Sequence, residues 1–155
     1  CILFGDGAGA VVLRAEEGES YHMVTHSDGS KGEALTCDTG SFMKMDGQEV
    51  FKFAVRQVPA CIAEVMEHNH LMAEDIDYFI LHQANRRIVE AVAKRMKVEL
   101  TKFPMNLQEY GNTSSASIPL LLDEMNREGR LKKGQKLVLA GFGAGLSWGA
   151  SLLEW

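Results

Sequence analysis

Residues 77–97 change abruptly from the pattern of a buried strand to that of an amphipathic helix. The segment 77–81 is apolar after its first residue and too short for a helix, which indicates a strand. Apolar residues then recur at helical spacing over 85–97, at Ile88, Val89, Val92, Ala93 and Met96. A strand that leads directly into such a helix is typical of layered α/β folds.

The rest of the chain predicts a mixed β-sheet with helices on its faces. One helix is predicted over 47–68, where Pro59 is expected to bend it, and another over 115–128, with a Ser or Thr cap, Pro119 near its start and Gly129 after its end. Strands are predicted over 1–4, 10–13, 21–26, 135–140 and 146–155, with Gly-rich bends at 5–9 and 141–145 and a long loop over 27–44. This order of elements predicts the α/β class.

Composition limits the class of protein. The 155 residues are 46% hydrophobic and 24% charged, which suits one globular domain and excludes disordered, collagen-like and coiled-coil chains. No apolar run reaches the roughly 18 to 20 residues of a membrane span, and no basic segment precedes an apolar block at the start. The net charge of -5 disfavours nucleic acid, although a local basic patch could still bind an acidic partner.

The cysteine spacing indicates the redox compartment, and the first residues indicate whether the chain is a whole protein. Cys1, Cys37 and Cys61 are spaced too widely for a disulfide framework or for a zinc site with paired ligands, so we expect a reducing cytoplasm. The chain begins within a strand pattern, and no initiator Met precedes it. We therefore expect residues 1–155 to be a piece of a longer protein whose missing part matters for function.

Three loops carry polar or glycine residues where a strand ends or a helix begins, at 82–85, 111–117 and 141–145. His82 follows a buried strand and precedes a helix, whose positive end favours a neutral imidazole that can donate a hydrogen bond. Asn112 follows Gly111 and offers a neutral amide donor before another helix. Together they could stabilise an oxyanion or an enolate. Taken singly, His82 also fits a structural histidine, Asn112 a turn residue, and the last loop an ordinary turn.

The combination of motifs is more specific than any one of them. The sequences LHQAN at 81–85, YGNTSSAS at 110–117 and GFGAGLSWG at 141–149 closely resemble the C-terminal half of the 3-oxoacyl-[acyl-carrier-protein] synthase III family. LFGDGAGA at 3–10 and MDGQEVFK at 45–52 also resemble that family, so the resemblance extends from end to end. It implies a thiolase-like fold in which two similar halves enclose the active site, and this chain is then the second half.

The resemblance also implies a reaction. The family's nucleophilic cysteine, in the first half, takes an acyl group from acyl-CoA and is then attacked by the carbanion that forms when malonyl-acyl carrier protein loses carbon dioxide. Cys1, Cys37 and Cys61 do not match that position, so we expect them to be structural and the chain to be inactive alone. The complete enzyme is expected to be a cytoplasmic homodimer that starts fatty acid synthesis without a cofactor.

Family positions suggest individual roles. His82 and Asn112 match the catalytic pair that donates hydrogen bonds to the malonyl thioester oxygen, and the backbone N–H of Ala144 matches a donor for the acyl oxyanion. Gly47 and Asn85 match positions that contact CoA, although Asn85 is also a natural helix cap. Phe51 and Phe142 either shape the acyl and malonyl channel or are core aromatics.

Basic residues near this site suggest a carrier-protein surface. Arg87 lies in the first turn of a helix, where the dipole disfavours a cation, and Lys94 and Arg95 follow two turns later. We expect all three to dock the acidic acyl carrier protein, with Arg87 the main contact. His68 and His70 lack the further ligands of a metal site.

Three alternatives remain open at this point. Polyketide- or quinolone-type condensing enzymes share the His and Asn pair and the same chemistry. A non-catalytic module could bind CoA or a carrier protein through Gly47, Arg87 and Lys94. A nucleotide-binding domain built on the glycines of 5–9 is disfavoured, because that segment leads into a strand pattern and not into a helix.

Overall fold

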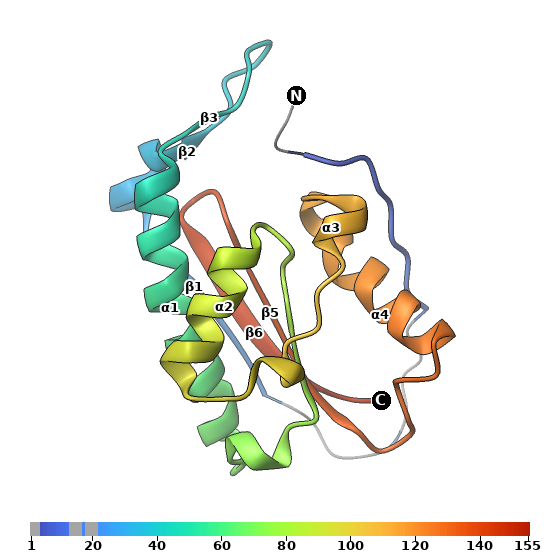
Figure 1. Ribbon diagram of the computed structural model, residues 1–155. Coiled ribbons are helices and arrows are strands. Elements are labelled where there is room, and N and C mark those ends of the chain that lie inside the picture. The colour runs from blue at the N-terminus through green and yellow to red at the C-terminus, as the bar shows by residue number, and fades with distance from the viewer. Residues whose placement is uncertain (1–3, 13–16, 18–21) are drawn as a thin grey trace.

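The computed structural model describes residues 4–12, 17 and 22–155, and Figure 1 shows how they are arranged. Its main sheet contains β1 (Met23–Ser27), β6 (Ser147–Glu154), β5 (Lys136–Gly143) and β4 (Tyr78–Leu81), in that spatial order. β4 pairs with β5 in parallel, whereas β5 with β6 and β6 with β1 are antiparallel. The sheet is therefore mixed, as the sequence predicts.

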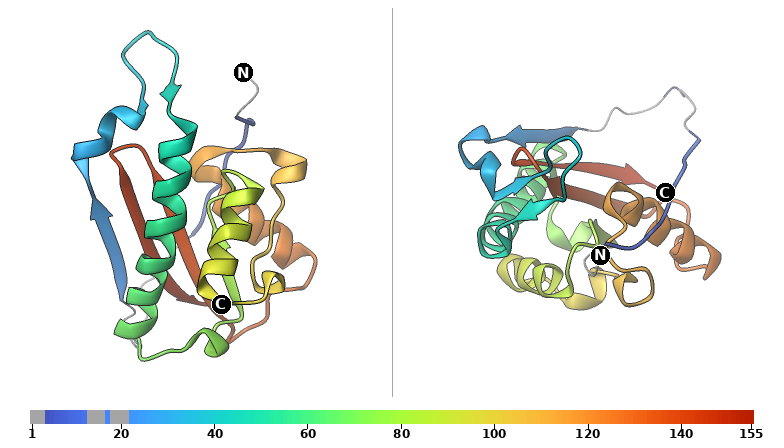
Figure 2. Two further views of the ribbon diagram at one scale, coloured as in Figure 1. Left: turned by 60° about the vertical axis from the view of Figure 1, so that its left-hand side comes forward. Right: turned by 90° about the horizontal axis from the view of Figure 1, so that it is seen from above.

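Two long helices cover one face of this sheet. α1 (Gly47–His68) and α2 (Arg86–Met96) pack side by side there, as both views of Figure 2 show. Their buried apolar residues meet those of the strands in one core, which includes Ala54, Ile62, Val65, Val89, Val92, Phe79, Leu81 and Val138. α1 continues through Pro59 as a single helix, and the predicted bounds of α1 and α2 agree with the structure to within one residue.

The opposite face carries a second, smaller core. α4 (Ser117–Arg127) packs there through Leu121, Leu122 and Met125 against Ile80 and Leu137. Because neighbouring strand residues point to opposite faces, Phe79 and Leu81 of β4 belong to the first core and Ile80 to the second. A strand buried on both sides needs an unbroken apolar run, which explains the sequence of β4.

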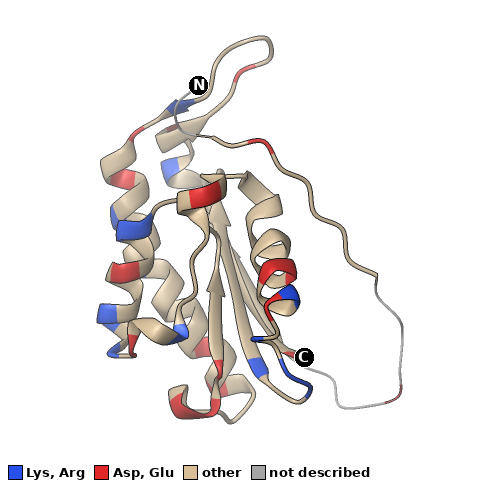
Figure 3. Ribbon diagram, turned by 45° about the vertical axis from the view of Figure 1, so that its right-hand side comes forward, with Lys and Arg blue, Asp and Glu red and all other residues tan. Residues whose placement is uncertain are grey.

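Short elements fill much of the predicted loop over 27–44. A 3-10 helix (Gly29–Ala34) leads into β2 (Leu35–Thr36), which pairs with β3 (Lys44–Met45) in a hairpin that projects above α1 in Figure 1. Further short helices are α3 (Leu107–Tyr110) and 3-10 turns at Ala73–Asp75, Leu100–Lys102 and Ser114–Ala116. The charged residues lie mainly on the helices and connections, while most of the sheet carries none (Figure 3).

The prediction of strands near the N-terminus is wrong within the described residues. Residues 5–12 adopt no regular secondary structure, and Phe4 makes only a single bridge, to Asn112. A strand needs a hydrogen-bonded neighbour along its length, and Val11 and Val12 pair with no strand among the described residues. Their side chains are 67% and 99% exposed. The rest of the predicted strand over 1–4, and Cys1 with it, lies outside the described residues, as does Leu13.

Two local predictions at the Gly-rich ends also need correction. α4 has no Ser or Thr side-chain cap, because its N-cap residue is Ala116, which has no side-chain oxygen. β5 runs on to Gly143, so the turn to β6 comprises 144–146 and is shorter than the predicted 141–145 bend. Among the described residues, no helix is both long and apolar enough to cross a membrane.

Candidate active site

His82 is fixed at the carboxyl end of β4. Its backbone N–H donates to the carbonyl of Ala140 on the neighbouring strand at 2.8 Å, which continues the parallel pairing. The Nδ1 atom of its ring lies 2.7 Å from Ser117 Oγ, and Phe142 meets the ring edge-on with centroids 5.3 Å apart. Burial lowers the pKa of His82 from its ordinary value of 6.5, so the imidazole is neutral near pH 7. The predicted neutrality thus has burial as its cause.

Asn112 lies in the turn before α4. Gly111 precedes it with a φ of 68°, a left-handed conformation that glycine adopts without strain. The Asn112 Oδ1 atom accepts a hydrogen bond from the backbone N–H of Ser114 at 2.9 Å. This bond orients the side-chain amide, and Nδ2 remains as a donor with no hydrogen-bond partner in the part of the chain that the structure describes.

One cavity brings the predicted catalytic groups together. It has a volume of about 240 Å³, and His82, Asn112, Phe142 and Ala144 are among the residues that line it. Phe142 also packs against the first core, so this aromatic is both a core residue and part of the cavity wall. The cavity holds two neutral side-chain donors, His82 and Asn112, and such donors stabilise negative charge that develops on an oxygen between them.

Ala144 lies in an exposed turn between β5 and β6. The turn is anchored to the segment after β1, because Leu146 and Asp28 exchange backbone hydrogen bonds of 2.9 and 2.8 Å. The backbone N–H of Ala144 makes no hydrogen bond to another described residue. It therefore remains a donor at the rim of the cavity.

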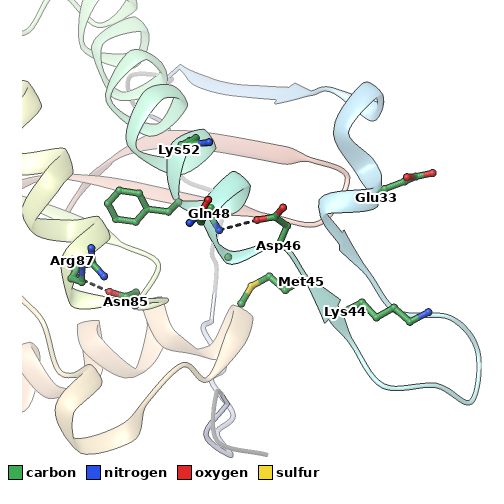
Figure 4. Close-up of a pocket in the computed structure, with 10 residues that line it drawn as sticks. Glu33, Lys44, Met45, Asp46, Gln48, Lys52, Asn85 and Arg87 are labelled. Atoms are coloured by element: carbon green, nitrogen blue, oxygen red, sulfur yellow. Dashed lines mark hydrogen bonds between the residues drawn. The ribbon is translucent and has the colours of Figure 1, made fainter.

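A larger pocket of about 1060 Å³ opens where α1 and α2 begin (Figure 4). Gly47 and Asn85, which the family resemblance assigns to CoA, line this pocket with Arg87, which it assigns to the carrier protein. Phe51 lines it too and also packs against the first core. Asn85 caps α2, since its Oδ1 accepts from the backbone N–H of Arg87 at 2.8 Å. The backbone of Gly47 faces open space, because an added Cβ would meet no atom within 4 Å.

Arg87 and its neighbours on α2 point to different partners. The guanidinium of Arg87 lies over the ring of Phe51, 5.6 Å from its centroid, and so remains at the pocket. Arg86 instead bonds Glu90 one turn along, at 2.7 Å. Lys94 and Arg95 are exposed in the last turn of α2 and line neither cavity, so the structure does not bring them to the pocket with Arg87.

Sequence reasoning missed two residues that the structure places near the candidate catalytic groups. Ser117 was expected to be one of the candidate helix caps, yet its hydroxyl contacts His82 and the backbone N–H of Gln83. Cys37, on the hairpin, lines the same cavity as His82 and Asn112. Neither placement has a sequence signal, because each partner lies at least 30 residues away along the chain. Among residues 4–12, 17 and 22–155, no three His, Cys, Asp or Glu side chains cluster as metal ligands would.

Comparison with known proteins identifies the family. The model of the family described as 3-Oxoacyl-[acyl-carrier-protein (ACP)] synthase III C terminal matches residues 66–155. The beta-ketoacyl-[acyl-carrier-protein] synthase III of Clostridium novyi (strain NT) is 48% identical over 170 residues, covering 100% of this chain and 52% of the relative.

Solved structures agree with this assignment. The 3-oxoacyl-(acyl carrier protein) synthase III of Pseudomonas aeruginosa PAO1 superposes with a TM-score of 0.92 and 41% identity, covering 99% of this chain and 50% of the other. The synthase III of Aquifex aeolicus VF5 gives 0.83 and 39%, covering 86% and 43%. The chain spans about half the length of the curated relatives it matches. With its mixed sheet and two-sided helical packing, the chain belongs to the 3-oxoacyl-[acyl-carrier-protein] synthase III family and has the α/β fold of the C-terminal half of these thiolase-like proteins.

Proposed function

We propose that this chain is the C-terminal half of an enzyme that condenses an acyl-CoA primer with malonyl-acyl carrier protein and releases carbon dioxide. The observation that carries the proposal is the 240 Å³ cavity that His82 and Asn112 share. Relatives that match the whole chain are named beta-ketoacyl-[acyl-carrier-protein] synthase III, which agrees with this chemistry. The N-terminal half supplies the nucleophilic cysteine.

The two side-chain donors act in the decarboxylation step. When the malonyl group loses carbon dioxide, negative charge moves onto its thioester oxygen, and the resulting enolate is held by His82 and Asn112. Neutral donors that are already oriented bind the charged oxygen more strongly than the uncharged thioester, so they lower the barrier. The enolate carbon then attacks the acyl group on the cysteine, and the cysteine leaves as the thiolate.

The remaining roles follow from position. The backbone N–H of Ala144 helps to hold the oxyanion that forms when the acyl-cysteine is attacked. The pocket at the start of α1 and α2 receives the pantetheine arm through Gly47, Phe51 and Asn85, and Arg87 at its edge docks the acidic carrier protein. Lys94 and Arg95 extend this surface along α2. The complete enzyme acts as a cytoplasmic homodimer without a cofactor.

Site-directed substitutions in the complete enzyme test the catalytic proposal. We expect His82→Ala and Asn112→Ala each to slow release of carbon dioxide from malonyl-carrier protein by about 10² to 10³, the usual effect of losing one such donor. Transfer of the acyl group from acyl-CoA to the cysteine should be partly retained. Exposed residues of the same types, His70→Ala and Asn126→Ala, are the matched controls.

The outcome separates an enzyme from a binding module. If carbon dioxide release by both variants stayed near the rate of the unsubstituted enzyme, His82 and Asn112 would be structural residues and the proposal would be wrong. A complete protein that binds malonyl-carrier protein but releases no carbon dioxide would indicate the non-catalytic module. The identity of the acyl-CoA primer that the complete enzyme accepts distinguishes fatty acid synthesis from polyketide- or quinolone-type condensation.

A further inference from the structure

Ser117, the first residue of α4, lies in direct contact with the ring of His82. It is 2% exposed, and its Oγ atom has two polar neighbours among the described residues. One is the backbone N–H of Gln83 at 3.2 Å, and the other is Nδ1 of His82 at 2.7 Å. The backbone N–H can only donate, so Ser117 Oγ accepts from Gln83 and uses one lone pair for that bond.

The hydroxyl hydrogen of Ser117 decides which atom donates in the bond between Ser117 Oγ and His82 Nδ1. A hydroxyl has one hydrogen to donate, and a buried hydroxyl needs an acceptor for it. If His82 Nδ1 carried the proton, it would donate to Ser117 Oγ, and the hydroxyl hydrogen would have no acceptor within the described part of the chain. If Ser117 donates to an unprotonated Nδ1, every group at this junction is satisfied.

That direction decides which ring nitrogen faces the substrate as a donor. A neutral imidazole carries one proton, and the hydrogen bond at one nitrogen fixes the proton on the other. Nδ1 faces Ser117, so Nε2 is the atom left for the cavity that His82 shares with Asn112. An unprotonated Nε2 would repel an enolate oxygen, whereas Nε2–H can bind it.

We propose that Ser117 is a positioning residue that donates its hydroxyl hydrogen to His82 Nδ1 and thereby keeps the catalytic proton on Nε2. Gln83 holds the serine in this role. Its backbone N–H fills one lone pair of Oγ, and its buried side chain bonds the Leu81 carbonyl at 2.8 Å and the backbone N–H of Asn106 at 3.3 Å. The catalytic part of this inference rests on the proposed function, whereas the position of the proton does not.

The position of the proton can be measured without turnover. In the complete enzyme with ¹⁵N-labelled histidine, two-bond ¹H–¹⁵N correlation spectra distinguish protonated from unprotonated ring nitrogens, and a His82→Gln variant assigns the His82 signals. We expect an unprotonated, hydrogen-bonded Nδ1 and a protonated Nε2, and a displaced Nδ1 signal in Ser117→Ala. A proton on Nδ1 in the unsubstituted enzyme would overturn the proposal, even if Ser117→Ala failed to fold.

Kinetics test whether the proton position matters for the reaction. We expect Ser117→Ala to lower kcat for carbon dioxide release by roughly 10- to 100-fold, the range known for orienting partners of histidines at metal sites, with KM for malonyl-carrier protein nearly unchanged. Ser117→Thr keeps the hydroxyl and should restore most of the rate. Ser115→Ala, two residues away and exposed, is the matched control and should keep the original rate.

The combined results separate this inference from the proposed function. An unchanged rate together with unchanged His82 signals in Ser117→Ala would refute the positioning role. A loss in Ser117→Ala that Ser117→Thr does not recover would show that packing, not the hydroxyl, is responsible. If the expected proton position were found in an enzyme that releases no carbon dioxide, the proposed function would fail while the assignment of the Ser117 hydrogen bond stood.

Discussion

At the scale of single residues, the burial of His82 links the site to stability. Burial lowers the pKa of His82, so the folded protein keeps this imidazole neutral at a pH where the unfolded chain already protonates it. Above about pH 6.5 both states are neutral, and His82 then has no effect on the pH dependence of stability. As the pH falls below that value, the unfolded state binds the extra proton and is favoured.

We therefore predict that His82 accounts for part of the acid sensitivity of the fold. The free energy of unfolding should fall as the pH drops below about 6.5, and it should fall less in His82→Gln. Denaturant titrations of the complete enzyme at several pH values measure this difference, with His70→Gln on an exposed turn as the control. Equal acid sensitivity of His82→Gln and the unsubstituted enzyme would mean that His82 is not desolvated as the structure indicates.

Arg87 allows a second prediction at this scale. Its guanidinium is held over Phe51 at the pocket, whereas its neighbour Arg86 is engaged with Glu90. Arg87→Glu should raise KM for malonyl-carrier protein about tenfold, equivalent to about 1.4 kcal/mol, and should affect acyl-CoA priming far less. Arg86→Glu is the matched control, because it reverses the adjacent charge on the same helix turn.

Ionic strength provides an independent check on the Arg87 prediction. Exposed charges are screened over about 8 to 10 Å, so added salt should weaken the carrier interaction of the unsubstituted enzyme and have less effect on Arg87→Glu. Equal losses for carrier protein and acyl-CoA would point instead to a contact with CoA itself. Similar losses in Arg86→Glu and Arg87→Glu would indicate a general effect of charge on the helix.

The site residues differ in how far the sequence can predict them. The sequence marks His82 and Asn112 as candidate site residues, because each lies in a distinctive motif just before a predicted helix. The role of Ser117 is not predictable, because its hydroxyl could cap α4 locally, and only the approach of β4 brings His82 Nδ1 to it. The sequence also predicts Arg87 near the site. It cannot exclude Lys94 and Arg95 from the pocket, because that depends on how far the pocket extends along α2.

At the scale of elements, the starts of the helices serve both folding and the pocket. Asp46 caps α1 by accepting hydrogen bonds from the N–H groups of Gln48 and Glu49, and Asn85 caps α2. Both caps line the pocket of 1060 Å³. Oδ1 of Asn85 accepts the capping hydrogen bond, so the Nδ2 amide group remains as the donor that this side chain can offer a ligand.

Variants of Asn85 separate these two tasks. Asn85→Asp keeps the accepting oxygen, so the thermal midpoint of the complete enzyme should change little, and the lost Nδ2 donor should raise KM for acyl-CoA. Asn85→Ala should also lose the cap, at a cost of about 0.5 to 2 kcal/mol of stability. If Asn85→Asp left KM for acyl-CoA unchanged, the Nδ2 donor of Asn85 would have no part in binding acyl-CoA.

Periodicity predicts the elements that form their own hydrogen bonds and fails for those that depend on a partner. α1 and α2 each combine an apolar stripe with a capping residue, and their bounds follow from the sequence. The two-residue strands β2 and β3 exist only through each other, so nothing local marks them. The apolar pattern over 10–13 shows the converse error, a predicted strand that does not form. Residues 10–12 pair with no strand in the part of the chain that the structure describes.

At the scale of the whole molecule, the site is assembled from distant parts of the chain. The cavity around His82 is also lined by Phe4, by Leu35 of the hairpin, by Val50 of α1 and by Gly143 after the last helix. Each segment reaches it because the sheet and its two cores bring the loops to one end. The individual motifs are visible in sequence, but their meeting in one cavity requires the fold.

Neither Cys61 nor Cys37 is suited to form an acyl-enzyme within these 155 residues. Cys61 is 2% exposed, and burial raises the pKa of its thiol to about 11, so only about one molecule in ten thousand carries the reactive thiolate near pH 7. Cys37 is exposed and lines the cavity, but its only polar contact with another described residue is the Ser41 carbonyl, 3.7 Å away. That carbonyl can accept a hydrogen from the thiol and cannot act as the base that a nucleophilic cysteine requires.

We therefore predict that residues 1–155 acquire no acyl group from acetyl-CoA, whereas the complete enzyme acquires one on its N-terminal half. Intact-mass and peptide mass spectrometry after incubation with acetyl-CoA measure this. Iodoacetamide provides the control for folding, because it should modify Cys37 and leave buried Cys61 unmodified in the folded chain. A stoichiometric acetyl adduct on Cys1, Cys37 or Cys61 of a chain that protects Cys61 from iodoacetamide would show that this half carries its own nucleophile, and the division of the active site between two halves would have to be abandoned.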